Sequence, residues 1–270
     1  MSVSVSGSYY LDPELYDIVY SDIVADVEPY VALLRGANGR ALEVCCGNGR
    51  LLVPVLAAGI ACDGLDLEPR MLADLRRKLV ARSGHPAKLG PTTLYQADMR
   101  DFSLPDRYAL ITIPFNSFLH NLTQADQLKT LRCLRDHLEV GGRLVMSVFH
   151  PSLEKLMQWS GQEQFLKELP HGDGRVRIFD RADDDRVEQI RHMTRRIEFS
   201  DAAGTVTRRE QLEFDLRYIW KPEMELLLHV AGFSRWEARP LFAGFGDATS
   251  RPREGPIREG DIVQWTAWKD

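Results

Sequence analysis

Short apolar runs alternate with helical patterns along residues 40–150. The apolar runs are typical of buried strands, and between them apolar residues recur every three or four positions, as on one face of a helix. The predicted strands are Ala41–Cys45, Ile60–Leu67, Thr92–Tyr95, Tyr108–Ile113 and Arg143–Phe149, and the predicted helices begin near Leu51, Pro69 and Thr123. Strands joined through helices run parallel, with right-handed crossovers. The alternation therefore predicts a doubly wound α/β sheet with helices on both faces.

The pattern changes after Pro151. Apolar and polar side chains then alternate with a period of two over Met193–Phe199 and Leu212–Trp220, on either side of Ala203-Gly204. This arrangement predicts an antiparallel β hairpin. The remaining predicted elements are a helix from Pro222 to Leu228 and a closing strand pair at Phe233–Arg239 and Ile262–Trp268.

Composition and charge exclude several classes of protein. The chain has 270 residues, of which 44% are hydrophobic, so it can bury a core without disulfides. Its net charge of −5 argues against broad nucleic-acid binding, which needs an excess of positive charge. The four cysteines form neither a disulfide framework nor a paired zinc signature. No signal peptide and no membrane-length apolar run is present, so we expect a cytoplasmic protein without membrane contact.

The candidate chemistry lies in a glycine turn between the first predicted strand and its helix. Gly47 and Gly49 let a ligand approach the backbone and expose amides at the start of a helix. Asp66 ends the next strand, 19 residues after Gly47, where a carboxylate accepts hydrogen bonds from ribose hydroxyls in nucleotide-binding folds. A dinucleotide fingerprint fails at Leu52, and no P-loop lysine follows. The remaining candidate is an adenosine ligand without a phosphate chain.

Four motifs in order resemble those of the class I S-adenosylmethionine-dependent methyltransferases. They are the glycine turn Glu43–Gly49, the second motif Gly64–Leu72, the segment Gln96–Phe102 that is similar to the family's adenine-holding segment, and the turn Leu138–Leu144 into the fifth strand. Among relatives, the chain is most similar to small-molecule enzymes that methylate amines of sugars or amino acids. The resemblance implies a seven-stranded Rossmann-like methyltransferase sheet with an antiparallel β insertion, and S-adenosylmethionine as cofactor, with S-adenosylhomocysteine as product.

The resemblance also implies a role for each matching residue. Glu43 would hold the amino group of the cofactor, the backbone of Cys46–Gly49 its methionine part, Asp66 its ribose and Asp98 its adenine amine. An aromatic pair on the N-terminal helix would close over the donor. The implied cofactor-binding residues are Tyr16, Tyr20, Glu43, Cys45, Cys46, Gly47, Asn48, Gly49, Asp66, Leu67, Met71, Ala97, Asp98, Met99, Pro114, Phe115 and Asn116. The alternative for the acids and tyrosines is a structural role, in a helix cap, a turn or a packed helix face.

Cys45 departs from the family pattern, because it stands where the family usually has its first glycine. We therefore expect that the backbone here does not need a positive φ. The apolar neighbours of Cys45 and Cys46 favour buried packing over a nucleophilic role.

The resemblance divides the chain into four parts. These are an N-terminal helical cap at 1–36, an S-adenosylmethionine-binding core at 37–150, an antiparallel hairpin insertion at 151–220 and a C-terminal helix and strand pair at 221–270. The apolar side of the hairpin needs a cover. We expect it to cap the acceptor pocket at the carboxyl ends of the strands, and a homodimer through the same segment is compatible with this. The more basic loop from Arg239 to Arg258 is an alternative anion-binding lid.

The implied reaction transfers a methyl group to a small-molecule nucleophile, an amine in our first hypothesis, by in-line substitution. An amine need only be neutral, whereas a hydroxyl requires a base within hydrogen-bond reach. The candidate catalytic residues are His120, His150 and Tyr20, and for both histidines a structural role is the competing hypothesis. The alternatives are an O-methyltransferase with a histidine base and a non-catalytic cofactor-binding protein.

We expect no metal site, because no ligand-like cluster follows the fourth or fifth strand. Nucleic-acid methylation is disfavoured, since Ile113–Asn116 lacks the Asp/Asn-Pro-Pro-aromatic motif.

Overall fold

The computed structural model describes residues 4–5, 9–83, 89–243 and 254–270. The helices are η1 (Tyr9–Leu11), α1 (Pro13–Tyr20), α2 (Val27–Arg35), α3 (Leu52–Ala57), α4 (Pro69–Ser83), η2 (Ser117–His120), α5 (Gln124–His137), α6 (Leu153–Trp159) and α7 (Lys221–Val230). The strands are β1 (Ser4–Val5), β2 (Ala41–Val44), β3 (Cys62–Asp66), β4 (Leu94–Gln96), β5 (Tyr108–Ile113), β6 (Leu138–Phe149), β7 (Glu163–His171), β8 (Gly174–Asp185), β9 (Ile190–Ser200), β10 (Val206–Arg217), β11 (Arg235–Ala243) and β12 (Asp261–Trp268).

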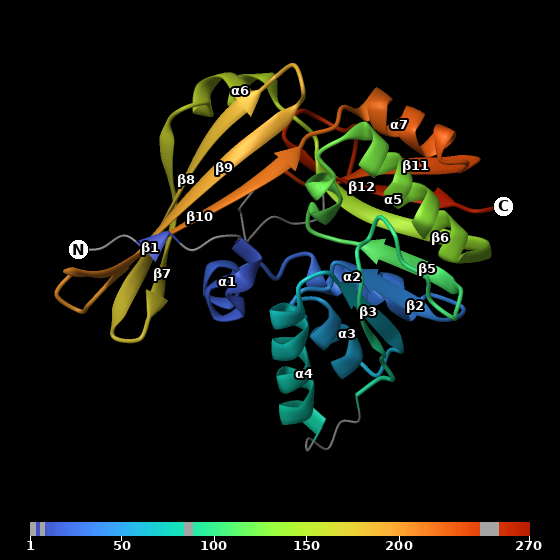
Figure 1. The fold of residues 1–270 in the computed structure, drawn as a ribbon, viewed down its shortest axis with the longest axis horizontal. Coiled ribbons are helices and arrows are strands. Elements are labelled where there is room, and N and C mark those ends of the chain that lie inside the picture. The colour runs from blue at the N-terminus through green and yellow to red at the C-terminus, as the bar shows by residue number, and fades with distance from the viewer. Residues whose placement is uncertain (1–3, 6–8, 84–88, 244–253) are drawn as a thin grey trace.

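The larger sheet has seven strands in the order β11-β12-β6-β5-β2-β3-β4. Strands β4, β3, β2, β5 and β6 pair in parallel, whereas β12 runs antiparallel to both β6 and β11. Helices cover both faces of this sheet, as Figure 1 shows. The predicted doubly wound, seven-stranded α/β fold is therefore confirmed.

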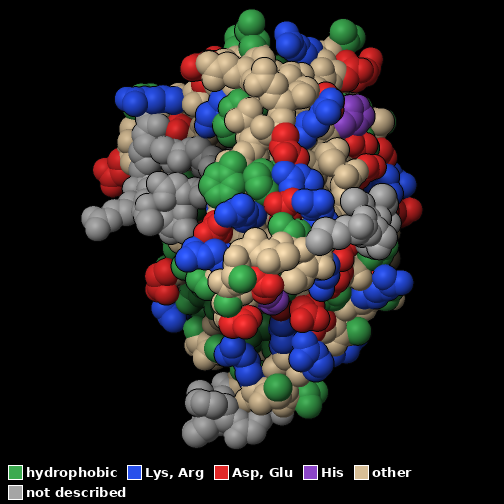
Figure 2. All heavy atoms as spheres, turned by 90° about the vertical axis from the view of Figure 1, so that its left-hand side faces the viewer, with side chains coloured by type: hydrophobic (Ala, Val, Ile, Leu, Met, Phe, Trp, Pro, Cys, Tyr) green, Lys and Arg blue, Asp and Glu red, His purple; other side chains and the backbone are tan. Residues whose placement is uncertain are grey.

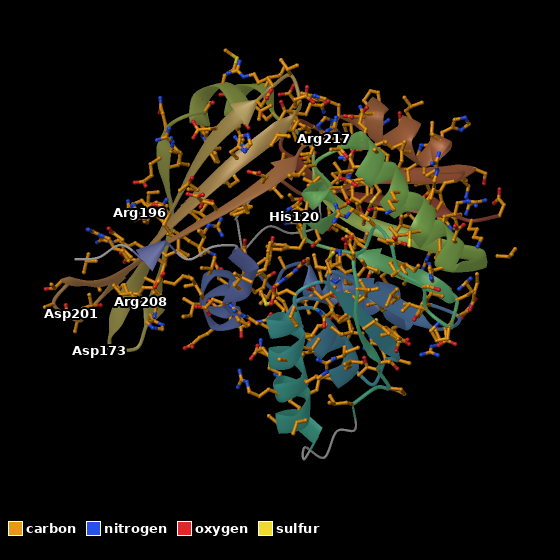
Figure 3. All side chains as sticks on the ribbon, viewed as in Figure 1. His120, Asp173, Arg196, Asp201, Arg208 and Arg217 are labelled. Carbon is orange, nitrogen blue, oxygen red and sulfur yellow. The ribbon has the colours of Figure 1, made fainter. Side chains whose placement is uncertain are left out.

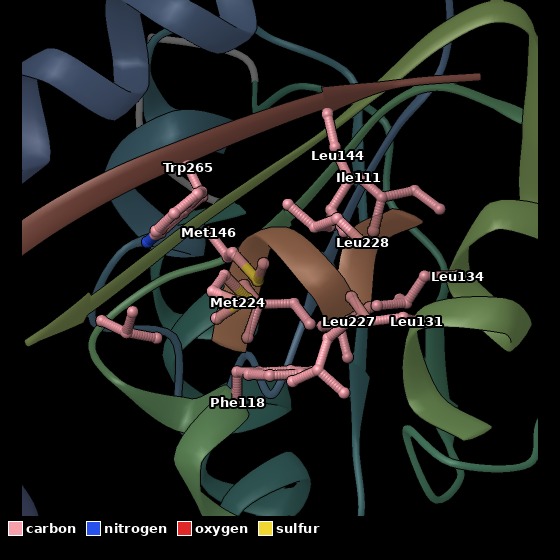
Figure 4. Packing of buried hydrophobic residues seen from close by; sticks show 14 of the residues in the cluster. Ile111, Phe118, Leu131, Leu134, Leu144, Met146, Met224, Leu227, Leu228 and Trp265 are labelled. Carbon is pink, nitrogen blue, oxygen red and sulfur yellow. The ribbon is translucent and has the colours of Figure 1, made fainter. Parts of the chain in front are cut away.

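Alternate residues of the central strands face opposite helical layers. Ile111 and Leu144 pack against helices α5 and α7 in one buried cluster, which Figure 4 shows from close by. Leu110 and Val145, one position along each strand, pack in a second cluster with side chains of α2, α3 and α4. A strand buried on both faces needs apolar residues at successive positions, which explains the continuous apolar run of β5.

The second sheet lies beside the first and has the order β1-β10-β9-β8-β7. One of its faces packs on helix α1: Val176, Ile197 and Leu212 join Leu15 and Val19 in a third buried cluster. The opposite face carries ion pairs between neighbouring strands. These include Arg177 with Glu168 and Arg209 with Glu198, and Arg196 on β9 reaches across β8 to pair with Glu163 on β7. Figure 2 shows Lys, Arg, Asp and Glu side chains intermixed on this end of the molecule.

The second sheet has more strands than the predicted hairpin. Strands β9 and β10 are the predicted hairpin, but β7, β8 and helix α6 were not predicted, and β1 adds an unpredicted parallel strand to β10. Strand β6 also begins earlier than predicted, at Leu138 instead of Arg143. Much of the basic loop from Arg239 to Arg258 lies outside the described residues.

Two further findings concern the described parts of the chain. No helix there is long and apolar enough to span a membrane. All four cysteines are free thiols.

Ile197 tests how much the second sheet contributes to stability. Its side chain is 0% exposed and packs against α1, so Ile197→Ala should lower the free energy of unfolding by about 2–5 kcal/mol. The exposed Val187, in the turn between β8 and β9, is a control: Val187→Ala should change it by less than about 0.5 kcal/mol. Denaturant unfolding of both variants measures the difference, and equal losses would show that the sheet face is not a core.

Candidate active site

The glycine turn between β2 and α3 is held by the end of β3. The carboxylate of Asp66 accepts hydrogen bonds from the backbone N–H of Gly47 (2.7 Å) and of Glu68 (2.9 Å). Both turn glycines have positive φ, 55° at Gly47 and 88° at Gly49. A Cβ at Gly49 would lie 2.4 Å from a Leu75 carbon, whereas a Cβ at Gly47 would meet nothing within 4 Å. Gly49 is thus needed for packing, and Gly47 borders open space.

The expectation for Cys45 was wrong. Its φ is 59°, so the position keeps the left-handed backbone that the family's glycine would adopt, although a Cβ makes this conformation costly. The side chain lies in the site: its Sγ is 3.7 Å from the Sδ of Met99. Burial raises the pKa of the Cys45 thiol well above its usual value, and the nearby Asp66 and Asp98 add to the shift. A neutral, unreactive thiol follows.

Glu43 is a buried carboxyl group with an unused oxygen. Glu43 is 2% exposed, and its Oε2 has no hydrogen-bond partner. Burial raises the pKa of Glu43 to about 8, against the opposing effect of the Arg50 guanidinium. Asn48, in the glycine turn, likewise has a buried Oδ1 without a partner. Two buried oxygens beside the turn are therefore suited to accept hydrogen bonds from a ligand's N–H groups.

Arg50 links three elements around the turn. It makes a bidentate pair with Asp26, with both N–O distances at 2.7 Å, and its guanidinium carbon lies 4.3 Å from the ring centre of Phe115. Phe115 and Asn116, directly after β5, both have positive φ, 58° and 65°. Ser147 holds this turn, since its Oγ accepts from the Phe115 N–H at 2.9 Å.

Helix α1 closes one side of the site with aromatic rings. The rings of Tyr16 and Tyr20 lie 4.7 Å apart, and that of Tyr20 lies 5.0 Å from Phe115. Asn48 fastens the helix to the glycine turn by donating to the Asp17 carboxylate at 2.8 Å. A cavity of about 410 Å³ opens against the same helix. It includes Tyr16, Tyr20 and Arg50 in its lining, but not the Asp66 side of the site.

The other predicted cofactor residues divide into two groups. Ala97, Asp98 and Met99 follow β4, and the Asp98 carboxylate is already paired with the Arg100 guanidinium at 2.6 Å. Hydrogen bonding from Arg100 lowers the pKa of Asp98, so this carboxylate is ionised. The remaining residues follow β2, β3 or β5 and differ in exposure: Cys46, Met71 and Pro114 are buried, and Leu67 is 62% exposed.

His120 lies where three parts of the chain meet (Figure 3). Its Nε2 is 2.7 Å from the Tyr10 hydroxyl, its ring hydrogen-bonds to the backbone of Asp215 on β10, and its ring centre is 6.5 Å from that of Phe214. Burial lowers the pKa of His120 to about 4. The imidazole is therefore neutral at pH 7, with one donor and one acceptor position used.

His150 has a different environment. Its Nδ1 contacts the Pro151 carbonyl at 3.2 Å, and its ring lies 5.7 Å from that of Trp220. Burial lowers the pKa of His150.

Three residues of the site were not predicted from the sequence. Arg50 was left out although it directly follows the glycine turn, and Tyr10 because nothing local links it to His120. Arg195, on β9, is buried; it donates to the Tyr20 hydroxyl at 3.0 Å and pairs with Asp180 at 2.6 Å. The available signal was that Arg195 falls in the same register as the apolar residues Met193, Ile197 and Phe199. Among the described residues, no group of three His, Cys, Asp or Glu could hold a metal ion.

A doubly wound seven-stranded sheet, with a glycine turn after one strand and an acid after the next, has the architecture of class I methyltransferases. The comparisons agree with this class. Residues 41–142 match a family described as methyltransferase domain. A curated relative, dTDP-3-amino-3,6-dideoxy-alpha-D-glucopyranose N,N-dimethyltransferase from Streptomyces fradiae, is 31% identical over 140 residues. That match spans 49% of this chain and 51% of the relative, so the chain covers about half the length of the relative.

Solved structures share the whole fold. The CcbJ methyltransferase from Streptomyces caelestis has a TM-score of 0.73 at 21% identity and covers 97% of this chain and 98% of its own. An amino pentose methyltransferase from Micromonospora echinaspora, solved with S-adenosylmethionine bound, has a TM-score of 0.69 at 21% identity, with 94% and 96% covered. The resemblance to class I S-adenosylmethionine-dependent methyltransferases is thus confirmed by the match of residues 41–142 to a methyltransferase domain and by the shared fold.

Substitution of Cys45 by glycine tests whether the positive φ at this position is strained. Glycine adopts positive φ without the steric cost that a Cβ adds, so Cys45→Gly should change stability little. Cys133, in the middle of α5, is the matched control, because Cys133→Gly places glycine inside a helix. We expect Cys133→Gly to lower the free energy of unfolding by at least about 1 kcal/mol more than Cys45→Gly, measured by denaturant unfolding. Equal losses would show that the Cys45 backbone stores no strain.

Proposed function

We propose that this protein transfers a methyl group from S-adenosylmethionine to the amine of a small molecule, an amino sugar carried on a nucleotide being our first choice. The fit of the cofactor carries this proposal. Glu43 has a buried oxygen without a partner, and Gly47 borders open space where a Cβ would meet nothing. The substrate class comes from the curated relatives, which are named as amino-sugar N,N-dimethyltransferases.

Each part of the cofactor has a matching group in the site. The Glu43 carboxyl would accept from the amino group, and the Asp66 carboxylate, whose oxygens each accept one backbone N–H, has lone pairs left for the ribose hydroxyls. Met99 and Cys45 would pack beside the adenosine. When bound, the cofactor supplies an electrophilic methyl group with its own leaving group, so the chain must mainly position the nucleophile and exclude water.

The acceptor would lie among the aromatic side chains between the core and the second sheet. Tyr20, Phe115, His120 and Phe214 come from four different elements there, and Tyr10 is hydrogen-bonded to His120. His120 is neutral at pH 7 and, with a pKa of about 4, is a weak base. A weak base is poorly suited to remove a hydroxyl proton, which favours an amine acceptor over O-methylation. Because Tyr10 and the Asp215 backbone occupy both ring nitrogens of His120, His120 would act by fixing the Tyr10 hydroxyl, whose oxygen could accept a hydrogen bond from the amine.

The remaining predictions fit this proposal but are secondary to it. Residues 151–220 would form the acceptor cap, and the same segment would serve a homodimer. A reducing cytoplasm suits four free thiols. His150, packed on Trp220, is given no part in the reaction.

Isotope transfer tests the function. With S-adenosylmethionine labelled in its methyl group, label should enter dTDP-3-amino-3,6-dideoxyglucose but not dTDP-glucose, which carries hydroxyls only. Asp66→Ala should weaken S-adenosylhomocysteine binding by about 1.5–3 kcal/mol, as expected for hydrogen bonds to a charged group, and calorimetry should detect no NAD binding to the wild type.

The outcomes separate the alternatives. Label in the hydroxyl sugar would favour an O-methyltransferase. Tight S-adenosylhomocysteine binding without transfer to any of a panel of amines would favour a non-catalytic binding protein, and NAD binding without adenosyl binding would refute the proposal.

The raised pKa of Glu43 predicts that cofactor binding releases a proton. With a pKa of about 8, most of the Glu43 carboxyls are protonated at pH 7 in the free protein. The ammonium group of S-adenosylhomocysteine would favour the ionised carboxylate, so binding at pH 7 should release up to one proton. Affinity should therefore rise as the pH increases from 6 to 8 and then level off.

Calorimetry in buffers of different ionisation enthalpy measures this proton count. Glu43→Gln, which cannot ionise, is the matched control and should lose both the release and the pH dependence. A wild type that releases no proton would contradict the assigned role of Glu43.

A further inference from the structure

A buried polar cluster joins the second sheet to the core, apart from the cofactor residues. Its centre is Arg217, the last residue of β10, which is 6% exposed. The guanidinium donates to Gln127 Oε1 (3.0 Å), Gln189 Oε1 (3.2 Å) and Glu223 Oε1 (2.8 Å). These four residues, here called the Arg217 cluster, come from β10, α5, the turn between β8 and β9, and α7. One side chain thus ties the insertion to both helices on its side of the core.

The charges of the Arg217 cluster are fully paired. Gln189 donates to the Glu223 carboxylate at 2.8 Å, and Gln124 donates to it at 3.0 Å. Burial would raise the pKa of Glu223, but hydrogen bonds from Gln124, Gln189 and Arg217 outweigh it and lower the pKa. A buried polar network in which every group is satisfied specifies one arrangement of the elements that it joins.

The network continues from Gln127 to the turn that carries His120. Gln127 is fully buried and its Nε2 donates to the Asn121 carbonyl at 3.2 Å. Asn121 directly follows His120 and ends η2, where its Nδ2 donates to the Phe118 carbonyl at 2.9 Å. Its own Oδ1 accepts from Thr130 at 2.9 Å. Gln127 therefore connects the guanidinium of Arg217 with the backbone of η2.

Strand β10 reaches the same histidine from the other side. Asp215, two residues before Arg217, hydrogen-bonds to the His120 ring through its backbone, and Phe214 lies beside that ring. Figure 3 shows Arg217 at the end of β10 that faces the core, with His120 below it at the same junction. The end of β10 and the turn η2 are therefore both attached to the Arg217 cluster.

We propose that Arg217 and Gln127 are positioning residues for methyl transfer: they fix the distance between β10 and η2, and with it the placement of His120 and Phe214 around the acceptor. The proposal rests on the proposed function, because it assigns the acceptor to this junction. A purely apolar contact here would hold the two elements together but would permit sliding, whereas directed hydrogen bonds define a register. Neither residue touches the cofactor site, so cofactor affinity should be independent of them.

Gln127→Met tests the proposal. The substitution conserves volume and leaves the Arg217–Glu223 ion pair. It removes the two side-chain hydrogen bonds of Gln127, the one from Arg217 and the one to the Asn121 carbonyl at the end of η2. The matched control is Tyr108→Phe, which removes one buried hydrogen bond to Asp63 (3.1 Å) at the opposite, amino-terminal end of β5. Thermal unfolding of both variants shows the structural cost, and S-adenosylhomocysteine calorimetry should give affinities within two-fold of wild type for both.

The decisive measurement is NMR titration of the His120 imidazole, assigned by comparison with His120→Gln. In wild type and Tyr108→Phe, His120 should stay unprotonated down to pH 5, since Tyr10 and the Asp215 backbone enclose it. In Gln127→Met its titration midpoint should rise by at least one pH unit, and transfer of labelled methyl to dTDP-3-amino-3,6-dideoxyglucose should show kcat at least ten-fold lower. An unchanged titration in Gln127→Met would overturn the proposal.

A second variant covers the case in which Gln127→Met does not fold. Arg217→Lys keeps a charge beside Glu223 but lacks the planar guanidinium fork that spans Gln127 and Glu223, and the same shift of the His120 titration is expected. The titration needs no acceptor, so it remains decisive even if the wild type methylates none of the amines supplied. A wild type that methylates none of these amines would refute the proposed function but leave the positioning of His120 by Gln127 intact.

Discussion

The site depends on the parallel pairing of β2 with β3 on one side and β5 on the other. Parallel strands end at the same edge of a sheet, so the three loops that follow them converge there. These loops contribute the glycine turn, Asp66 and the turn at Phe115. The hydrogen bond from Gly47 to Asp66 then fixes the first two loops to each other. This register brings Glu43, Asp66 and Phe115, which are far apart in sequence, to the same edge of the sheet.

Helix α1 is the second constraint, because one short helix serves two structures. Leu15 and Val19 complete the core of the second sheet, while Tyr16 packs on Tyr20 and Tyr20 packs on Phe115. The two tyrosines also contact the edge of that core, because residues three and four apart lie on neighbouring parts of a helix surface. The helix is therefore both the floor of the second sheet and a wall of the proposed active site. A change in the sheet that moves α1 must also move the tyrosines.

Local chemistry was predictable from the sequence and non-local chemistry was not. Gly47, Gly49 and Asp66 were found because the turn and the strand that follows it are close in sequence. Tyr10 and His120 are 110 residues apart in sequence, and no local pattern in either segment predicts their hydrogen bond. Strand β8 was missed because arginine and aspartate cover its outer face, although Val176 and Ile178 carry the period of two. The backbone of Cys45 was misjudged because residue type limits φ less strictly than surrounding hydrogen bonds do.

Positive φ at residues other than glycine marks where this chain accepts local strain. Within the described residues there are four such positions, Cys45, Phe115, Asn116 and Gln189. Strained backbones persist only where the surroundings over-determine them, and they concentrate at functional sites. Three of the four lie in the loops around the glycine turn. The fourth, Gln189, is far from that turn in sequence but belongs to the Arg217 cluster, where its side chain bonds both Glu223 and the Tyr218 carbonyl. The strain at Gln189 therefore places the Arg217 cluster in the same category as the glycine turn: a junction whose geometry is held against the local preference of the chain.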